Sequence, residues 1–126
     1  MSMWTHIVAV LDVDTNRCTD DIVTYVEEKL KGAPKITGSE KDAYVYVNRL
    51  PGHNASFYDG KNDKKYQTRV VITVIGDLRD RMKVQTEKEW DAFKSFIGYD
   101  MDGEWIDRDD SLNFMIRNCS CEIKGR

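Results

Sequence analysis

The first strand that the sequence predicts carries apolar residues on both of its faces. Residues 4–14 (WTHIVAVLDVD) are rich in the β-branched residues that favour strands. One face carries Ile7, Ala9 and Leu11, and the other carries Val8 and Val10. Because strands in the middle of a sheet are apolar on both faces, the pattern predicts a central strand.

A helix and a half-buried strand are predicted next. A polar N-terminal signal at residues 19–21 precedes four apolar residues at helical spacing, and Gly32 and Pro34 predict the helix end. Those four are Ile22, Tyr25, Val26 and Leu30. Residues 43–50 (AYVYVNRL) then alternate as a strand does. Its outward positions are Tyr44, Tyr46 and Asn48.

A long loop and a long strand follow. Residues 51–65 (PGHNASFYDGKNDKK) contain two turn signals, and a loop of this length in a compact domain is often functional. Residues 66–75 (YQTRVVITVI) predict a strand that ends at Gly76.

The last third of the chain predicts a second helix and a final strand. Thr86-x-x-Glu89 has the spacing of a capping box, which predicts that the helix opens there. Its apolar stripe is Trp90, Phe93 and Ile97. Residues 112–123 predict the final strand or strand pair, with Cys119 and Cys121 on one face as small core residues.

The order strand, helix, strand, strand, helix, strand predicts one α+β domain over residues 1–126. We expect a ferredoxin-like, split βαβ sandwich, in which two helices cover one face of an antiparallel sheet. The first and third strands are expected side by side and parallel, with residues 12–14 and 77–81 meeting at one rim. The apolar residues on the uncovered face favour a homodimer or larger assembly formed through it.

Composition narrows the class of protein. The chain has 126 residues, of which 33% are charged and 40% are hydrophobic, and this is globular composition. A net charge of −3 argues against binding long nucleic acids. No apolar run is long enough to span a membrane, and the first residues lack the basic-then-apolar pattern of a signal peptide, so we expect neither. Three cysteines fit reduced thiols, so we expect the protein to act where it is made.

The segment after the long strand is the strongest candidate for anion binding. Arg79 and Arg81, with Arg69 on the strand itself, carry planar guanidinium groups that suit phosphate oxygens. The same segment also fits a solvated turn with ion pairs to Asp77 and Asp80. The glycines show neither P-loop nor dinucleotide-binding spacing, and we expect no cofactor.

The predicted loop carries groups that could recognise a nucleoside. Asn48, His53 and Asn54 are candidates for ribose or base edges, and Phe57 or Tyr58 for stacking on the base. A surface loop without a ligand is the alternative.

A metal site is a further alternative. Asp12 and Asp14 would approach Asp77 and Asp80 at the shared rim, where two carboxylates could hold one Mg²⁺. No nucleophile lies at motif spacing to either histidine.

Four segments, roughly a third of the chain, resemble a small phage and prophage protein family, the first Thoeris anti-defence family. They are WTHIVAVLDVDT, APKITGSE, GHN and YQTRVVITVIGDLRDR. The resemblance implies an oligomeric phage protein in the host bacterial cytoplasm that binds a cyclic ADP-ribose signal made by a bacterial TIR enzyme, without cleaving it. Some members are reported to hold cyclic oligonucleotides at a separate site. Family members vary in length across residues 51–65, so the resemblance assigns no pocket residues there.

These observations together predict a non-catalytic anti-defence protein that sequesters a cyclic ADP-ribose or cyclic nucleotide signal. Two alternatives stay open. One is a metal-dependent phosphodiesterase that degrades such a signal with Asp12, Asp14 and Asp77. The other is a protein that binds and inhibits a host defence complex.

Overall fold

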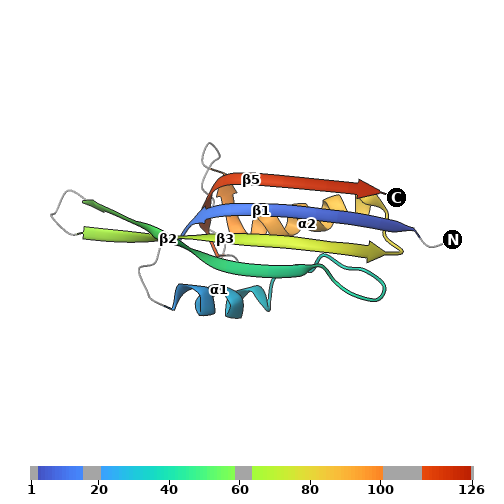
Figure 1. The fold of residues 1–126 in the computed structure, drawn as a ribbon, viewed down its shortest axis with the longest axis horizontal. Helices are drawn as coiled ribbons and strands as arrows, with labels where there is room; N and C mark the ends of the chain where they lie inside the picture. The colour runs from blue at the N-terminus through green and yellow to red at the C-terminus, as the bar shows by residue number, and fades with distance from the viewer. Residues whose placement is uncertain (1–2, 16–20, 59–63, 101–111, 126) are drawn as a thin grey trace.

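The described part of the chain folds as an α+β protein with a five-stranded sheet. A computed structural model describes residues 3–15, 21–58, 64–100 and 112–125, and only the backbone within 51–58 and 64–67. Its elements are β1 (Trp4–Asp14), α1 (Ile22–Leu30), β2 (Tyr44–Tyr58), β3 (Lys64–Arg79), α2 (Lys83–Ile97), β4 (Gly98–Asp100) and β5 (Phe114–Gly125) (Figure 1). Residues 19 and 20 of the predicted helix start lie outside the described part. No described helix has the length and apolarity needed to cross a membrane.

The strand order across the sheet is β2-β3-β1-β5-β4. β1 is central, as predicted, and lies antiparallel to both β3 and β5, while the short β4 runs parallel to β5. The expectation that β1 and β3 run parallel is therefore wrong. A helical crossover makes β2 parallel to β1, and the β2–β3 hairpin then reverses the chain. A strand inserted between β1 and β2 must run antiparallel to both.

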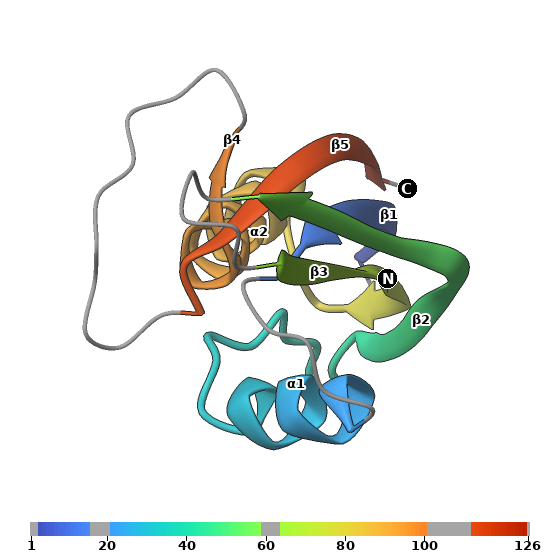
Figure 2. The ribbon, with the colours of Figure 1, turned by 90° about the vertical axis from the view of Figure 1, so that its left-hand side faces the viewer.

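One face of the sheet carries the hydrophobic core. On β1 the fully buried apolar residues are Ile7, Leu11 and Val13, with Ala9 almost fully buried. Their neighbours across β3 are Val70, Ile72 and Val74. Both helices supply residues to the same cluster, including the predicted stripe Trp90, Phe93 and Ile97. Both helices thus cover one face, and Figure 2 shows them on the concave side of the curved sheet.

The hairpin of β2 and β3 is longer than predicted. Residues 51–58 continue β2 and residues 64–65 belong to β3, so the predicted loop over 51–65 is wrong for these positions. Figure 1 shows the ends of both strands projecting beyond the rest of the sheet. The pairing register shifts between Arg49 and Asn54, which are opposite Val70 and Thr68. The extra residues form a bulge that accommodates Pro51, whose nitrogen cannot donate to a ladder.

Two predicted boundaries also differ from the structure. Gly76 does not end β3, which continues to Arg79. A Cβ atom at Gly76 would lie 3.0 Å from the Ala43 Cα atom, so glycine permits close approach of the residue that precedes β2. Helix α2 begins one turn before the predicted capping box. The Met82 N–H donates to Oε1 of Gln85 at 2.9 Å, and Thr86 lies inside the helix.

The cysteines near the C-terminus are exposed rather than part of the core. Cys119 and Cys121 lie opposite Leu11 and Ala9, on the face that the helices cover. β4 pairs with β5 only as far as Ile116, so the cysteines lie on the part of β5 beyond that pairing. The prediction that they are core residues is therefore wrong.

Candidate functional site

The arginines at the end of β3 bind groups of the protein itself. Arg79 forms an ion pair with Glu40, and its Nε lies 4.0 Å from the Asp80 carboxylate. Arg81 donates from Nε to the Thr37 hydroxyl at 3.2 Å and from Nη1 to the Asp80 carbonyl at 3.0 Å. Of the two interpretations of this segment, anion binding or a turn with internal ion pairs, the structure therefore shows the internal contacts.

These contacts hold the connection between α1 and β2, residues 31–43. Ser39 donates its N–H to the Arg79 carbonyl at 3.0 Å and its hydroxyl to the Asp80 carboxylate at 2.9 Å. On the α2 side, Glu89 accepts from the Thr37 N–H at 2.9 Å and from the Thr37 hydroxyl at 2.6 Å. The connection is thereby fixed to both β3 and α2.

Arg69 lies far from Arg79, so the predicted grouping of three arginines is wrong. Arg69 pairs with Asp14 at one end of β1, whereas Arg79 pairs with Trp4 at the other. Ten residues along a strand span about 33 Å. No single diphosphate could contact both guanidinium groups within one subunit.

The antiparallel register also separates the aspartates proposed for a metal. Asp12 lies opposite Val71, whereas Asp77 lies opposite His6, about 20 Å along β3. The expected meeting of these carboxylates at one rim is wrong. Among the residues that the structure describes, no group of three or more His, Cys, Asp or Glu side chains is placed to hold a metal ion.

The sheet face away from the helices, called the open face below, carries exposed aromatic and apolar side chains. Tyr44 and Tyr46 are each 52% exposed, and their rings stack with centroids 6.3 Å apart and planes inclined by 22°. Val10 and Ile75 are 37% and 39% exposed beside them. The backbone register places Tyr46, Thr73 and Val10 in one row across three strands.

One row further along, the open face becomes polar. Asn48 lies opposite Val71, which lies opposite Asp12, and Asp12 lies opposite Asn118. Both asparagines are exposed, and the Asn118 amide donates to Asp12 at 3.5 Å. Amide groups can donate and accept hydrogen bonds, as recognition of a base edge requires.

An ionic cluster, Asp12, Asp14, Arg69 and Arg117, closes this end of the open face. Arg69 is paired with Asp12, and its Nε lies 3.6 Å from Asp14, which also forms an ion pair with Arg117. The Asp14 side chain is only 2% exposed, whereas that of Arg117 is 40% exposed. The two arginines balance the charges of the two aspartates, and the Arg117 guanidinium group lies at the exposed side of the cluster.

The opposite end of the open face carries two further charged pairs. His6 Nδ1 lies 2.7 Å from Asp77 Oδ1, and Lys124 Nζ lies 2.7 Å from Glu122 Oε1. The hydrogen bond and charge of Lys124 lower the pKa of Glu122, and Glu122 raises the pKa of Lys124 in return. The aromatic region therefore lies between two charged ends.

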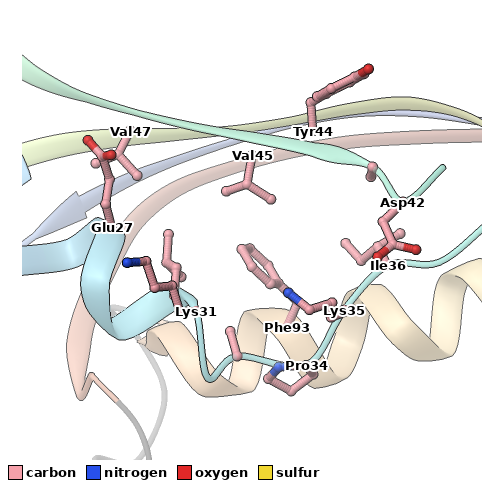
Figure 3. Close-up of a pocket in the computed structure, with 13 residues that line it drawn as sticks. Glu27, Lys31, Pro34, Lys35, Ile36, Asp42, Tyr44, Val45, Val47 and Phe93 are labelled. Carbon is pink, nitrogen blue, oxygen red and sulfur yellow. The ribbon is translucent and has the colours of Figure 1, made fainter. Parts of the chain in front are cut away.

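A pocket lies on the other side of β2. It has a volume of about 380 Å³ and is walled by α1, the α1–β2 connection, β2 and α2. In Figure 3, Val45 points from β2 into the pocket toward Phe93 of α2, while Tyr44 points to the opposite side of the strand. All of the lining residues except Phe93 fall within residues 27–47, but they surround one space only after the chain has folded, so no sequence motif indicated the pocket.

The remaining predicted site residues differ in how much of them the structure describes. Asn48 is on the open face, as its alternation predicted. His53, Asn54, Phe57 and Tyr58 lie on the extended part of β2, and their side chains are outside the described part of the structure. The alternating pattern had already placed Tyr44 and Tyr46 outward, and their exposure makes them the strongest aromatic candidates.

These features define the chain as an α+β protein with a long hairpin, an open aromatic sheet face and a separate pocket. No known protein family, no curated protein and no solved structure matches the chain.

Proposed function

We propose that the protein captures a small nucleotide-derived anion on the open face and holds it without cleaving it. A cyclic ADP-ribose or cyclic nucleotide signal is the ligand class that the resemblance to the Thoeris anti-defence family implies. The observation that carries the proposal is the pair of stacked, half-exposed tyrosines, Tyr44 and Tyr46, on a sheet face that no described helix covers.

The side chains near these tyrosines suit the parts of such a ligand. A base stacked on an aromatic side chain gains about 1–3 kcal/mol. Asn48 and Asn118 lie in the next row and can bind base or ribose edges. Arg117, at the exposed side of the ionic cluster, supplies a guanidinium group for a phosphate.

The open face of one subunit alone would leave one side of the ligand in water. We therefore propose a homodimer in which two open faces enclose the ligand, as the exposed Val10 and Ile75 favour. Sequestration depends on affinity, and an enclosed, preorganised site reduces the entropy lost on binding.

The split βαβ sandwich remains our proposal for the fold family. It is supported by the order β2-β3-β1-β5, in which every long strand lies antiparallel to its neighbours. β3 separates the parallel strands β1 and β2, as insertion into a βαβ unit requires.

The alternative functions differ in their support. The phosphodiesterase alternative depended on aspartates that lie at opposite ends of β1 and β3, so its proposed metal site has no geometric basis. A protein that binds a host defence complex would use the same open face. It is a possible outcome of the experiment below.

The test is recovery of the ligand from the protein. The protein is purified from cells that produce TIR-derived signals and heated, and the supernatant is analysed by mass spectrometry. We expect an intact cyclic nucleotide-type ligand, the same with and without chelator. Tyr46→Ala should lose the ligand and Tyr46→Phe should retain it, because the ring provides stacking.

Two results would contradict the proposal. Ligand retained by Tyr46→Ala but lost by Arg79→Ala would place the site at the end of β3, as the sequence alone indicated. Hydrolysed products, or a co-purified protein without a small molecule, would favour the alternative functions.

A further inference from the structure

The pocket beneath β2 has the size and lining of a small-molecule site. Its volume of about 380 Å³ falls within the range of about 300–1,000 Å³ that such sites occupy. Most of the lining is apolar: Leu30, Ala33, Pro34, Ile36, Val45, Val47 and Phe93. Charged residues also line it, namely Glu27 and Lys31 from the α1 side and Lys35 and Asp42 from the α1–β2 connection. Small-molecule sites combine such an apolar lining with a few polar groups that orient the ligand.

The walls of this pocket are held in place by contacts outside it. The Ala43 N–H donates to the Ile36 carbonyl at 2.8 Å, which closes the connection into a loop. Thr37 is bound to Glu89 of α2, and the ion pair of Arg79 with Glu40 secures the outer side of the loop. A pocket with fixed walls loses little entropy when a ligand enters.

The charges at the pocket indicate what kind of ligand enters. Lys31 is bound to Glu28 at 3.0 Å on the surface of α1. Glu27, Lys35 and Asp42 also line the pocket. Figure 3 shows Glu27 at one end beside Val47 and Asp42 at the other end beside Ile36, with Lys35 between these two carboxylates. An anionic group beside Lys35 would be attracted, and an uncharged ring would contact Val45 and Phe93.

We propose that this pocket binds a small ligand made of a planar, largely apolar ring system with one anionic group. The ring lies between Val45 and Phe93, and the anion lies at Lys35. The pocket and the open face are on opposite sides of β2, so this site is separate from the one proposed for signal capture and does not depend on it.

The test uses 8-anilinonaphthalene-1-sulfonate, which has this chemistry, with the full chain. Binding is followed by fluorescence, and Val45→Trp, which fills the pocket, should weaken it at least about tenfold. Val84→Trp is the matched control, because Val84 is 50% exposed on α2 and does not line the pocket. Lys35→Glu should weaken binding about three- to fivefold, while Lys41→Glu on the same connection leaves it unchanged.

Methyl NMR shifts locate the probe independently of the substitutions. We expect the sulfonate to shift the methyl signals of Ile36 and Val47, both of which line the pocket. Shifts confined to Val10 and Ile75 would place the probe on the open face and overturn the proposal. Equal affinity of Val45→Trp and Val84→Trp, with both folded by circular dichroism, would overturn it as well. If Val45→Trp fails to fold, the comparison of Lys35→Glu with Lys41→Glu decides.

Discussion

Replacing Thr86 by valine tests where α2 begins. The capping-box pattern makes Thr86 the N-cap residue, and removing an N-cap hydroxyl destabilises a protein by about 1 kcal/mol. In the structure Thr86 lies inside α2 and is fully buried, and its hydroxyl has no hydrogen-bond partner among the described residues. The two interpretations thus predict opposite signs for the change in stability.

The magnitude follows from the burial of that hydroxyl. A buried hydroxyl without a partner costs about 1–3 kcal/mol. Valine has nearly the same shape and helix propensity as threonine, so Thr86→Val removes the cost without opening a cavity. We expect the free energy of unfolding to rise by about 1–2 kcal/mol, which corresponds to about 4–8 °C in Tm for a chain of this size.

Urea unfolding followed by circular dichroism at 222 nm measures the change. The urea midpoint should increase while the m-value stays constant, because the surface exposed on unfolding is the same. Thr24→Val is the control, since Thr24 is exposed on α1 and its replacement should change stability by less than about 0.5 kcal/mol. A midpoint that falls by the equivalent of 1 kcal/mol in Thr86→Val would refute the reasoning and restore the N-cap.

Three further predictions follow from other sites. Asp14→Asn should reduce the free energy of unfolding by about 3 kcal/mol, because it leaves two arginines beside a buried neutral group. Urea unfolding measures this loss, and no change would mean that the ionic cluster is solvated. Gly98→Ala should cost about 3 kcal/mol or more in the same assay, because its Cβ atom would lie 1.7 Å from the Phe114 carbonyl oxygen; an unaffected midpoint would contradict the β4–β5 pairing. The pKa of Cys121 is raised to about 11 by partial desolvation and by the neighbouring Cys119, Asp91 and Glu87. At pH 8 its alkylation should therefore be about tenfold slower than that of a free thiol, and the rate should increase up to pH 11. Mass spectrometry measures the rate. Equal rates at pH 8 would show that the thiol is not shielded.

Local patterns in the sequence predicted the elements that depend on local chemistry. The bounds of β1 and its two faces followed from alternation within residues 4–14, and the buried stripe of α2 followed from the spacing of Trp90, Phe93 and Ile97. The predicted direction of β3 relative to β1 was wrong because this direction depends on how often the chain reverses between the two strands. The predicted N-terminus of α2 was wrong because Thr86 has the spacing of a capping box but is buried against the core.

Turn residues misled the sequence interpretation in the hairpin for a related reason. Pro51 and Gly52 predict a loop locally, yet pairing with β3 carries the backbone of β2 through them with a bulge. Gly76 predicted a strand end, but here it allows Ala43 to approach closely. In both places contacts between distant segments decide the conformation that the local residue types leave open.

The candidate site shows the same division between local and distant information. The outward position of Tyr44, Tyr46 and Asn48 could be predicted from alternation alone. The separation of Arg69 from Arg79 could not, because it depends on the antiparallel register of β1 and β3. The pocket could not be predicted either, since it depends on how residues 27–47 fold back on themselves and on Phe93 of α2.

The register of β2 determines what each of the two proposed sites contains. Because successive side chains of a strand point to opposite faces, Tyr44 and Tyr46 reach the open face while Val45 reaches the pocket. A slip of one residue against β3 would place the tyrosines in the pocket and Val45 in solvent. The close approach at Gly76 on one side and the bulge after Arg49 on the other restrict that slip. Pairing within the hairpin, rather than a single motif, therefore gives this strand an aromatic side and an aliphatic side.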